Sequence, residues 1–225
     1  MKIIITCGPS YEPIDGARRM TNMSTGKLGV TLANFLTDPG HEVICLKGEG
    51  STFCGPLSVS RVETFTTNDD LAQRLKSISR LENIDAVFHA AALCDYRVEQ
   101  VLSAAGEAMS SAKFATRDGR LHLVLAPAMK VLPKLRDWFP DARVVGWKYE
   151  LAGSRDDAFA KAWKQLRDCF TDACVLNGAA YGEGFAVCHA DGSVETCAET
   201  LGLCVLLNDW LQRESPVVAP AQNFA

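Results

Sequence analysis

The chain of 225 residues is long enough for one large domain or two small ones, and its composition, 48% apolar and 22% charged, is ordinary for a globular protein. Its formal net charge is −4 and its basic residues are scattered, so we expect neither a nucleic-acid groove nor a membrane-surface patch. No apolar run approaches the ~20 residues of a membrane span and no signal peptide is evident, which predicts a cytoplasmic protein.

Strands and helices alternate through the first part of the chain. A short β-branched run predicts a buried parallel strand at 2–6, and further strands are predicted at 41–48 and 84–93. Apolar residues at helical spacing predict helices at 26–40 and 67–81, the second with Asn68 or Asp69 as its N-cap. This alternation implies right-handed crossovers, and the predicted fold class is α/β, a doubly wound Rossmann-like parallel sheet with helices on both faces.

The alternation breaks at residues 97–120, which are rich in Ala, Ser and Gly and only weakly periodic. We expect an inserted arm there, as a long loop or partly helical excursion. Regular elements then resume: strands at 121–126, 142–151 and 172–179, helices at 128–139, 154–169 (capped by Ser154) and 198–213, and a hairpin at 184–197 with its turn at Asp191-Gly192. Without a repeat or linker, the chain should form a single domain at 1–213, followed by a flexible tail at 214–225.

The nine cysteines are odd in number, form no C-x-x-C pair, and in several cases stand inside apolar runs. We therefore expect reduced thiols that act as small buried hydrophobic residues. The four histidines show no ligand spacing with the cysteines, so no zinc site is expected. His89, beside an apolar strand, is interpreted as a core residue.

The ends of the predicted strands indicate where a ligand would bind. In an open parallel sheet, ligands lie outside the carboxyl ends of the strands. The residues that follow the strands should therefore converge on one crevice: Gly8 and Ser10, Ala92 to Asp95, Trp147 and Lys148, and Asn177. This argument gives the place of the site and leaves the ligand open.

The loop at residues 8–29 joins the first strand to the first helix. It has the spacing of neither a Walker A loop nor a G-x-G-x-x-G dinucleotide loop. Ser24, Thr25 and Gly26 stand just before a helix, whose free amide groups favour an anion, so phosphate is the expected ligand. The alternative is that Ser24 or Thr25 merely caps the helix and the arginines are solvated.

Five motifs of the chain resemble, in the same order, those of phosphopantothenate-cysteine ligase of coenzyme A biosynthesis. They are EPIDGARRMTNMSTGKLG, AAALCDYR, KF before LHLVLAP, VVGWKYEL and ACVLN. The resemblance runs from residue 3 to about residue 212. Many bacterial members are fused behind a flavin-dependent decarboxylase domain, and none precedes Met1, so we expect a stand-alone ligase.

In this family a nucleoside triphosphate activates the carboxylate of 4′-phosphopantothenate, pyrophosphate leaves, and the amine of cysteine attacks the acyl nucleotidylate. The resemblance therefore implies Mg²⁺ and CTP or ATP, with phosphopantothenate and cysteine as the other substrates. Such a site must screen several negative charges at once. The resemblance also implies a homodimer in which the arm reaches toward the partner.

The resemblance assigns roles to several of these residues. Asn22 corresponds to the asparagine that holds the acyl nucleotidylate and Arg18 to the family arginine, while Lys113 corresponds to the first lysine of a catalytic motif. Trp147 takes the place of a family phenylalanine beside the nucleotide, and Asp95 is a candidate metal ligand. Combined with the strand-end argument, the prediction is Asn22 and Lys113 as catalytic, Arg18, Asn22 and Asn177 as substrate-binding, and Gly8, Ser10, Ser24, Gly26, Ala92, Asp95, Trp147 and Lys148 as nucleotide-binding.

Each assignment has a structural alternative. Asn22 could simply make a turn, and Asp95 could cap one. Asn177 could have a structural role at its strand end, and Trp147 alone would be interpreted as core. Lys113 could be a solvated lysine on a disordered loop.

The lysine motif departs from the bacterial pattern. Bacterial members often have K-x-K-K where this chain has Lys113-Phe114-Ala115-Thr116, and only the first lysine aligns, as in the eukaryotic branch. Bacterial members mostly use CTP and eukaryotic members ATP, so both nucleotides stay open. Two other functions also stay open: a dinucleotide-dependent oxidoreductase, against which the missing G-x-G-x-x-G counts, and a catalytically silent binding module, which the changed motif favours.

Overall fold

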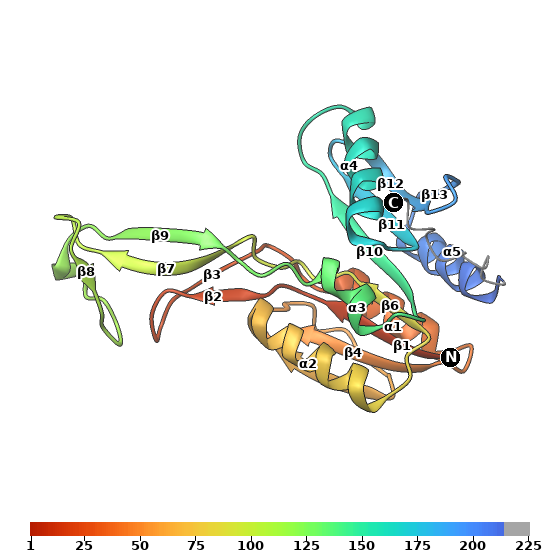
Figure 1. The fold of residues 1–225 in the computed structure, drawn as a ribbon, viewed down its shortest axis with the longest axis horizontal. Coiled ribbons are helices and arrows are strands. Elements are labelled where there is room, and N and C mark those ends of the chain that lie inside the picture. Colours follow the sequence, from red (N-terminus) through yellow and green to blue (C-terminus); the bar gives the residue numbers. More distant parts are fainter. Residues whose placement is uncertain (214–225) are drawn as a thin grey trace, which may run out of the picture.

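The computed structural model describes residues 1–213, and the predicted tail at 214–225 lies outside the described residues. At its centre is an eight-stranded sheet with the order β13-β12-β11-β10-β6-β1-β4-β5 (Figure 1). Strands β5, β4, β1, β6, β10 and β11 are parallel to one another, β12 pairs antiparallel with β11, and β13 pairs antiparallel with β12. The bounds of these strands are β1 Lys2–Cys7, β4 Glu42–Gly48, β5 Arg61–Phe65, β6 Ala86–His89, β10 Arg143–Tyr149, β11 Ala173–Gly178, β12 Gly182–His189 and β13 Val194–Cys197.

The parallel strands follow the 3-2-1-4-5-6 order of doubly wound sheets. From the β5 edge to the middle of the sheet, the neighbouring strands are β5, β4 and β1, the reverse of their order in the chain. From the middle onward they are β6, β10 and β11, in the order of the chain. The direction of winding changes between β1 and β6, which is where such sheets bind ligands. The predicted fold class is therefore confirmed.

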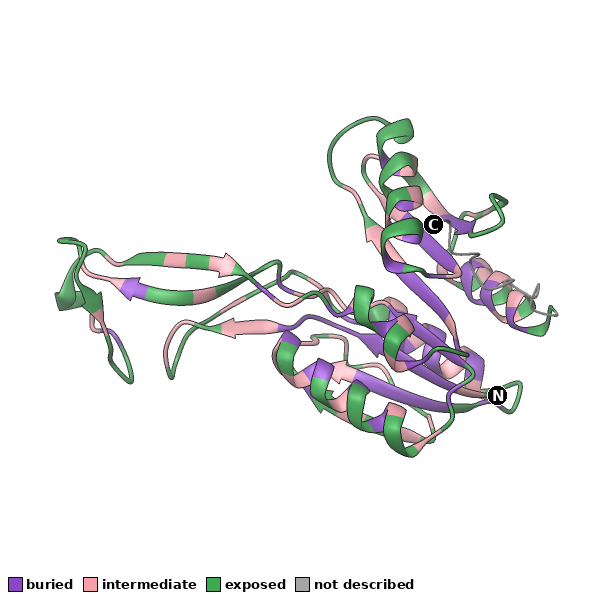
Figure 2. Ribbon diagram, viewed as in Figure 1, coloured by how far each residue is buried: buried purple, intermediate pink, exposed green. Residues whose placement is uncertain are grey.

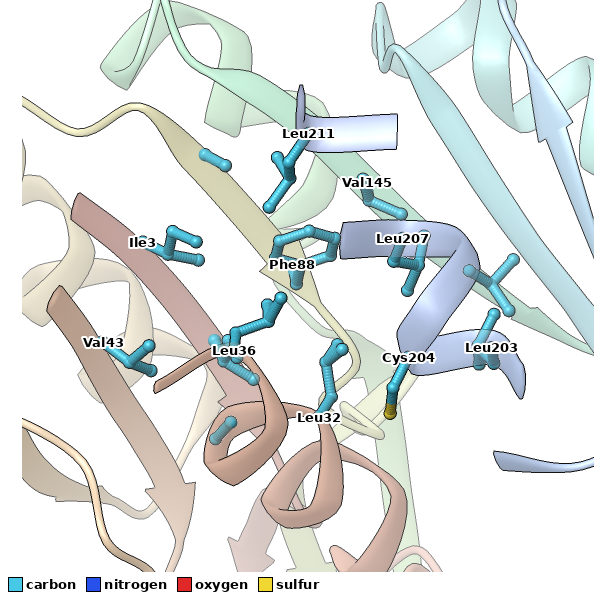
Figure 3. Close-up of a cluster of buried hydrophobic side chains, with 14 of the residues drawn as sticks. Ile3, Leu32, Leu36, Val43, Phe88, Val145, Leu203, Cys204, Leu207 and Leu211 are labelled. Atoms are coloured by element: carbon cyan, nitrogen blue, oxygen red, sulfur yellow. The ribbon is translucent and has the colours of Figure 1, made fainter. Parts of the chain in front are cut away.

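Helices cover both faces of the sheet. One face is covered by α1 (Lys27–Thr37) and α5 (Thr200–Gln212), and the other by α2 (Asn68–Leu81), α3 (Leu135–Trp138) and α4 (Arg155–Cys169). Successive side chains of β1 alternate between the faces, so Ile3 packs against α1 and α5 (Figure 3), whereas Ile4 packs toward α2 and α3. The strands at the middle of the sheet are buried along most of their length (Figure 2). Because both faces are covered, Ile3, Ile4 and Ile5 form a continuous buried apolar run in this strand.

An arm of β-structure extends away from the sheet (Figure 1). It is a three-stranded antiparallel sheet of β7 (Tyr96–Leu102), β8 (Ala108–Met109) and β9 (His122–Pro127), with a 3₁₀ turn at Thr116–Asp118. The prediction of a loop or partly helical segment at 97–120 is therefore wrong. The strand pairing is non-local, and a register shift between Val98 and Gln100 interrupts the alternation that would have revealed β7.

Two further elements were not predicted. The loop at 8–29 contains a small hairpin of β2 (Tyr11–Pro13) and β3 (Arg19–Thr21), and β5 forms one edge of the main sheet. The predicted helix at 128–139 is reduced to a 3₁₀ turn at Leu132–Lys134 followed by the single turn of α3.

The helix caps agree with the sequence in one case and differ in another. Ser154 caps α4 as predicted, with its hydroxyl accepting from the amide of Asp157. Helix α2 is capped by Thr67 and not by Asn68 or Asp69. The Asn68 side chain is buried and donates instead to the backbone carbonyls of Cys94 (2.8 Å) and Met129 (2.9 Å), so it ties the helix to the ends of other elements.

Most of the thiols and His89 are buried core residues, as predicted. All nine cysteines are free, and all but Cys54 and Cys197 are buried. The His89 ring is buried, bonds to the Thr6 hydroxyl over 2.8 Å, and has its pKa lowered to about 4 by burial. No helix within residues 1–213 is long and apolar enough to cross a membrane.

Candidate active site

The candidate site lies where the loops after β1 and β6 continue side by side beyond the sheet. Pro9 and Ala92 form a parallel bridge, the Ala92 amide donates to the Gly8 carbonyl (2.9 Å), and the Ser10 amide donates to the Ala92 carbonyl (3.2 Å). Three predicted site residues therefore meet at the point where the winding of the sheet reverses. Topology alone accounts for this convergence.

Asn22 is attached to the same place from the other side of the loop. Its Nδ2 atom donates to the backbone carbonyls of Ala92 (3.2 Å) and Leu93 (2.9 Å). Both amide hydrogens are thereby used, while no residue in the described part of the chain donates to Oδ1. The carbamoyl oxygen of this exposed side chain is thus the atom available to a ligand.

Ser10 was predicted to contact the ligand, but its side chain lies inside the protein. It is fully buried; its hydroxyl donates to Asn68 Oδ1 (2.7 Å) and accepts from the Cys94 amide (2.8 Å). These bonds join the loops after β1 and β6 to helix α2. The Ser10 side chain therefore positions the site, and its nucleotide contact stays a prediction.

Two glycines form the floor of the expected anion loop. Gly8 and Gly26 both have left-handed backbones, with φ of 77° and 79°. A Cβ at Gly26 would lie 2.5 Å from Ser51 Oγ and 3.3 Å from the Cα of Gly8, and a Cβ at Gly8 would also collide with Ser51. Only glycine fits both positions, because backbone conformation and space each exclude a side chain.

Ser51 lies against this anion loop from another loop of the chain, and the sequence analysis missed it. It follows β4 in the loop at 49–53, and its Oγ atom is buried without a hydrogen-bond partner in the described residues. The same strand-end argument that selected Gly8 and Ala92 would have included it if applied to β4.

The start of α1 supports part of the predicted anion site. Its N-cap is Gly26, without any side-chain cap, so the free amides of the first turn stay open to a ligand. Ser24 does not cap the helix, whereas the Thr25 hydroxyl accepts from the Lys27 amide over 3.2 Å. The alternative that a side chain caps the helix thus holds only for Thr25. Its hydroxyl occupies the Lys27 amide and leaves the other amides of the first turn free.

The residues at the ends of β10 and β11 are divided between the faces of the sheet. Trp147 is half-buried against the α1 and α5 face, and its Nε1 has no acceptor within residues 1–213. Lys148, the next residue in the strand, therefore points to the other face, where it pairs with Glu150 over 3.3 Å beside Lys161 of α4. The backbone carbonyl of Asn177 accepts a hydrogen bond from the Glu150 amide (2.9 Å). One ligand cannot meet the Trp147 and Lys148 side chains from the same face.

Asp95 was the candidate metal ligand. Its side chain is 73% exposed and forms an ion pair with Lys130. Within residues 1–213, no group of three or more His, Cys, Asp or Glu side chains is arranged to hold a metal ion. Residues 1–213 thus place the Asp95 carboxylate here without a metal cage around it.

Arg18 and Lys113 lie away from this crevice. Arg18 forms an ion pair with Asp15 and donates to the Phe114 carbonyl (2.7 Å), while the Phe114 amide donates to Asp15 (3.2 Å). This clasp joins the turn between β2 and β3 to the segment after β8, out along the arm (Figure 1). The hydrogen bond from Arg18 holds the pKa of Asp15 well below its usual range. Lys113 is exposed next to the clasp.

Comparisons with known proteins agree with this architecture. The family model described as DNA/pantothenate metabolism flavoprotein C-terminal domain matches residues 1–199. The solved structure of the DNA/pantothenate metabolism flavoprotein of Streptococcus pneumoniae superposes with a TM-score of 0.80 at 21% identity, covering 94% of this chain and 98% of that one. A Cab2 mutant in complex with phosphopantothenate-cysteine has a TM-score of 0.70 at 18% identity, covering 93% of this chain and 87% of that one. At these identities the likeness concerns the fold.

Curated relatives are also similar in sequence. The coenzyme A biosynthesis bifunctional protein CoaBC of Thermococcus kodakarensis is 28% identical over 177 residues, which is 78% of this chain and 41% of that protein. The CoaBC protein of Bacillus subtilis is 27% identical over 218 residues, 96% of this chain and 47% of that protein. The chain thus spans less than half the length of these relatives.

Proposed function

Because the chain belongs to the family of the DNA/pantothenate metabolism flavoprotein C-terminal domain, we propose that it joins cysteine to 4′-phosphopantothenate in coenzyme A biosynthesis. The relatives named as coenzyme A biosynthesis proteins support this proposal. The observation that carries it is the juxtaposition of an anion loop, built on Gly8 and Gly26, with the fixed amide of Asn22. The anion loop suits a phosphate, and the Asn22 amide suits the acyl group beside that phosphate.

The reaction would proceed in two steps that share this crevice. A carboxylate oxygen of phosphopantothenate attacks the α-phosphorus of a nucleoside triphosphate, and pyrophosphate leaves. The amine of cysteine then attacks the acyl carbon, the nucleoside monophosphate leaves, and the amine proton passes to solvent. The amides at the start of α1 would hold phosphate oxygens, and Asn22 Oδ1 would orient the acyl part. CTP and ATP are both retained as the nucleotide.

Mg²⁺ is proposed as the metal because it neutralises charge on a triphosphate. This ion usually keeps several waters and binds through one or two carboxylates plus substrate phosphates. The single carboxylate of Asp95, exposed and next to Lys130, fits an ion that arrives with the nucleotide, and it does not fit a metal held by protein alone.

We also propose a two-fold homodimer in the cytoplasm. Lys113 lies out on the arm and Arg18 is bonded to the same arm segment, while the anion loop lies at the sheet, so the arm of one copy would serve the crevice of the other. The arm carries exposed apolar side chains, Tyr96, Leu123 and Leu125, which a partner would cover.

The test is product formation by the purified protein. Phosphopantothenate, cysteine and Mg²⁺ are incubated with CTP or ATP in parallel, and phosphopantothenoylcysteine is measured by mass spectrometry. We expect product only when all three substrates are present. Ligand binding without product would favour the silent binding module, and neither binding nor product with either nucleotide would contradict the proposal.

A further inference from the structure

A second pocket lies next to the anion loop, at the same edge of the sheet. It has a volume of about 510 Å³ and is formed by the first turns of α1 and α5 and the start of β12. Its lining includes Lys27, Thr31, Phe185, Glu199, Thr200 and Leu201. Lys27 directly follows Gly26, so the pocket and the anion loop share the start of α1.

The pocket contains one positive and one negative side chain that are not paired. Lys27 and Glu199 are both exposed, and neither forms an ion pair with any residue among 1–213. By contrast, Lys148 and Lys161 both pair with Glu150. Two opposite charges that line one pocket without pairing could each bind the oppositely charged group of one ligand.

We propose that this pocket binds the amino-acid substrate as its zwitterion, an inference that rests on the proposed ligase function. Lys27 would hold the α-carboxylate and Glu199 the α-ammonium, while Phe185 and Leu201 supply an apolar surface for a small side chain. Glu199 disfavours a triphosphate in the same place, because a carboxylate repels a polyanion. The amino acid would thus be held beside the phosphate of the acyl nucleotidylate.

The experiment compares two amines, cysteine and cysteamine, which lacks the carboxylate. In Lys27→Met we expect kcat/KM for cysteine to fall about tenfold or more, while the value for cysteamine stays within about twofold. In Glu199→Gln the KM for cysteine should rise about tenfold, with the KM values for nucleotide and phosphopantothenate unchanged. Lys76→Met and Asp141→Asn, which remove exposed charges away from the pocket, are the matched controls, and thermal melting checks that each variant is folded.

The outcomes separate this inference from the function on which it rests. If the wild-type protein makes no amide from cysteine, the ligase function fails. If the wild-type protein is active but Lys27→Met affects cysteine and cysteamine equally, or affects neither, the pocket does not bind the carboxylate. A rise in the nucleotide KM without any change for cysteine would assign the pocket to the triphosphate and overturn the inference.

Discussion

At the scale of single residues, Asn22 shows how a loop side chain can be fixed before a ligand binds. Its Nδ2 atom is held by two backbone carbonyls of the loop after β6, so Oδ1 has a defined direction. Fixing a polar atom in advance reduces the entropy lost when the reacting groups are aligned.

Asn22→Ala should lower kcat/KM for ligation by about 10²-fold, roughly 3 kcal/mol, because it removes a group that aligns the intermediate. Asn34→Ala is the matched control, since Asn34 also bonds a loop carbonyl, that of Pro56, but lies away from the crevice. It should reduce the melting temperature and leave the rate near that of the wild type. Steady-state kinetics with both variants makes the comparison, and equal losses of rate would show that Asn22 only stabilises the loop.

Gly26→Ala tests the floor of the anion loop. Gly26 and Gly106 both have left-handed backbones, with φ of 79° and 83°, but nothing lies within 4 Å of a Cβ at Gly106. Both alanine variants should lose about 1 kcal/mol from backbone strain, and Gly26→Ala should lose about 1–3 kcal/mol more from its collision with Ser51. Urea denaturation measures the difference, and the second substitution Ser51→Gly should restore part of it. Equal losses at the two glycines would show that space at Gly26 is not limiting.

At the scale of elements, local sequence patterns predicted the helices and strands that pack in the layers of the main sheet. The buried strands, α1, the Ser154 cap and the hairpin turn at Asp191-Gly192 follow from period and turn chemistry. The arm strands could not be predicted in this way, because β7 pairs with β9, which lies more than a dozen residues later in the chain, and because a bulge interrupts β7. The convergence of Gly8 and Ala92 was predictable from topology, whereas the burial of Ser10 depends on the exact partners of its hydroxyl, which no sequence pattern reports.

The clasp between Asp15 and Arg18 predicts how the arm responds to pH. The folded-state pKa of Asp15 lies below its ordinary value of 3.8, so the clasp contributes stability above that value and loses it as the pH falls toward the lowered pKa. We expect the protection of the Phe114 amide, measured by hydrogen exchange, to be constant from pH 7 to about 4.5 and to fall only below about pH 4. Asp15→Asn should lose this protection already at pH 7. Protection that declines between pH 7 and 5 would mean that another group controls the clasp.

At the scale of the whole molecule, the sheet and the arm each carry part of the proposed site. The anion loop and Asn22 lie at the sheet, and Lys113 lies on the arm beside the Asp15–Arg18 clasp. A charge on an arm that extends away from the sheet suits a group that arrives after the substrates and stabilises the negative charge that develops as the amine attacks.

Mixed dimers test whether the arm works across the subunit interface. Lys113→Ala and Asn22→Ala should each lower turnover by about 10² or more, the first without loss of nucleotide binding. If the arm serves the partner, an equal mixture of the two variants recovers about a quarter of the wild-type activity, since half of the dimers carry one intact site out of two. Arg120→Ala, on the same exposed arm segment, is the control for Lys113→Ala. No recovery on mixing, or a monomer mass in light scattering at every concentration, would contradict the shared site.

The central claim, that this site activates a carboxylate as an acyl nucleotidylate, is tested most directly with phosphopantothenate whose carboxylate is labelled with ¹⁸O. In the proposed reaction one labelled oxygen stays on the α-phosphorus when cysteine displaces the nucleotide. Mass spectrometry should therefore find ¹⁸O in CMP or AMP in step with the amide product, and unlabelled pyrophosphate. Label in orthophosphate, or amide formed without label in the nucleoside monophosphate, would contradict the account.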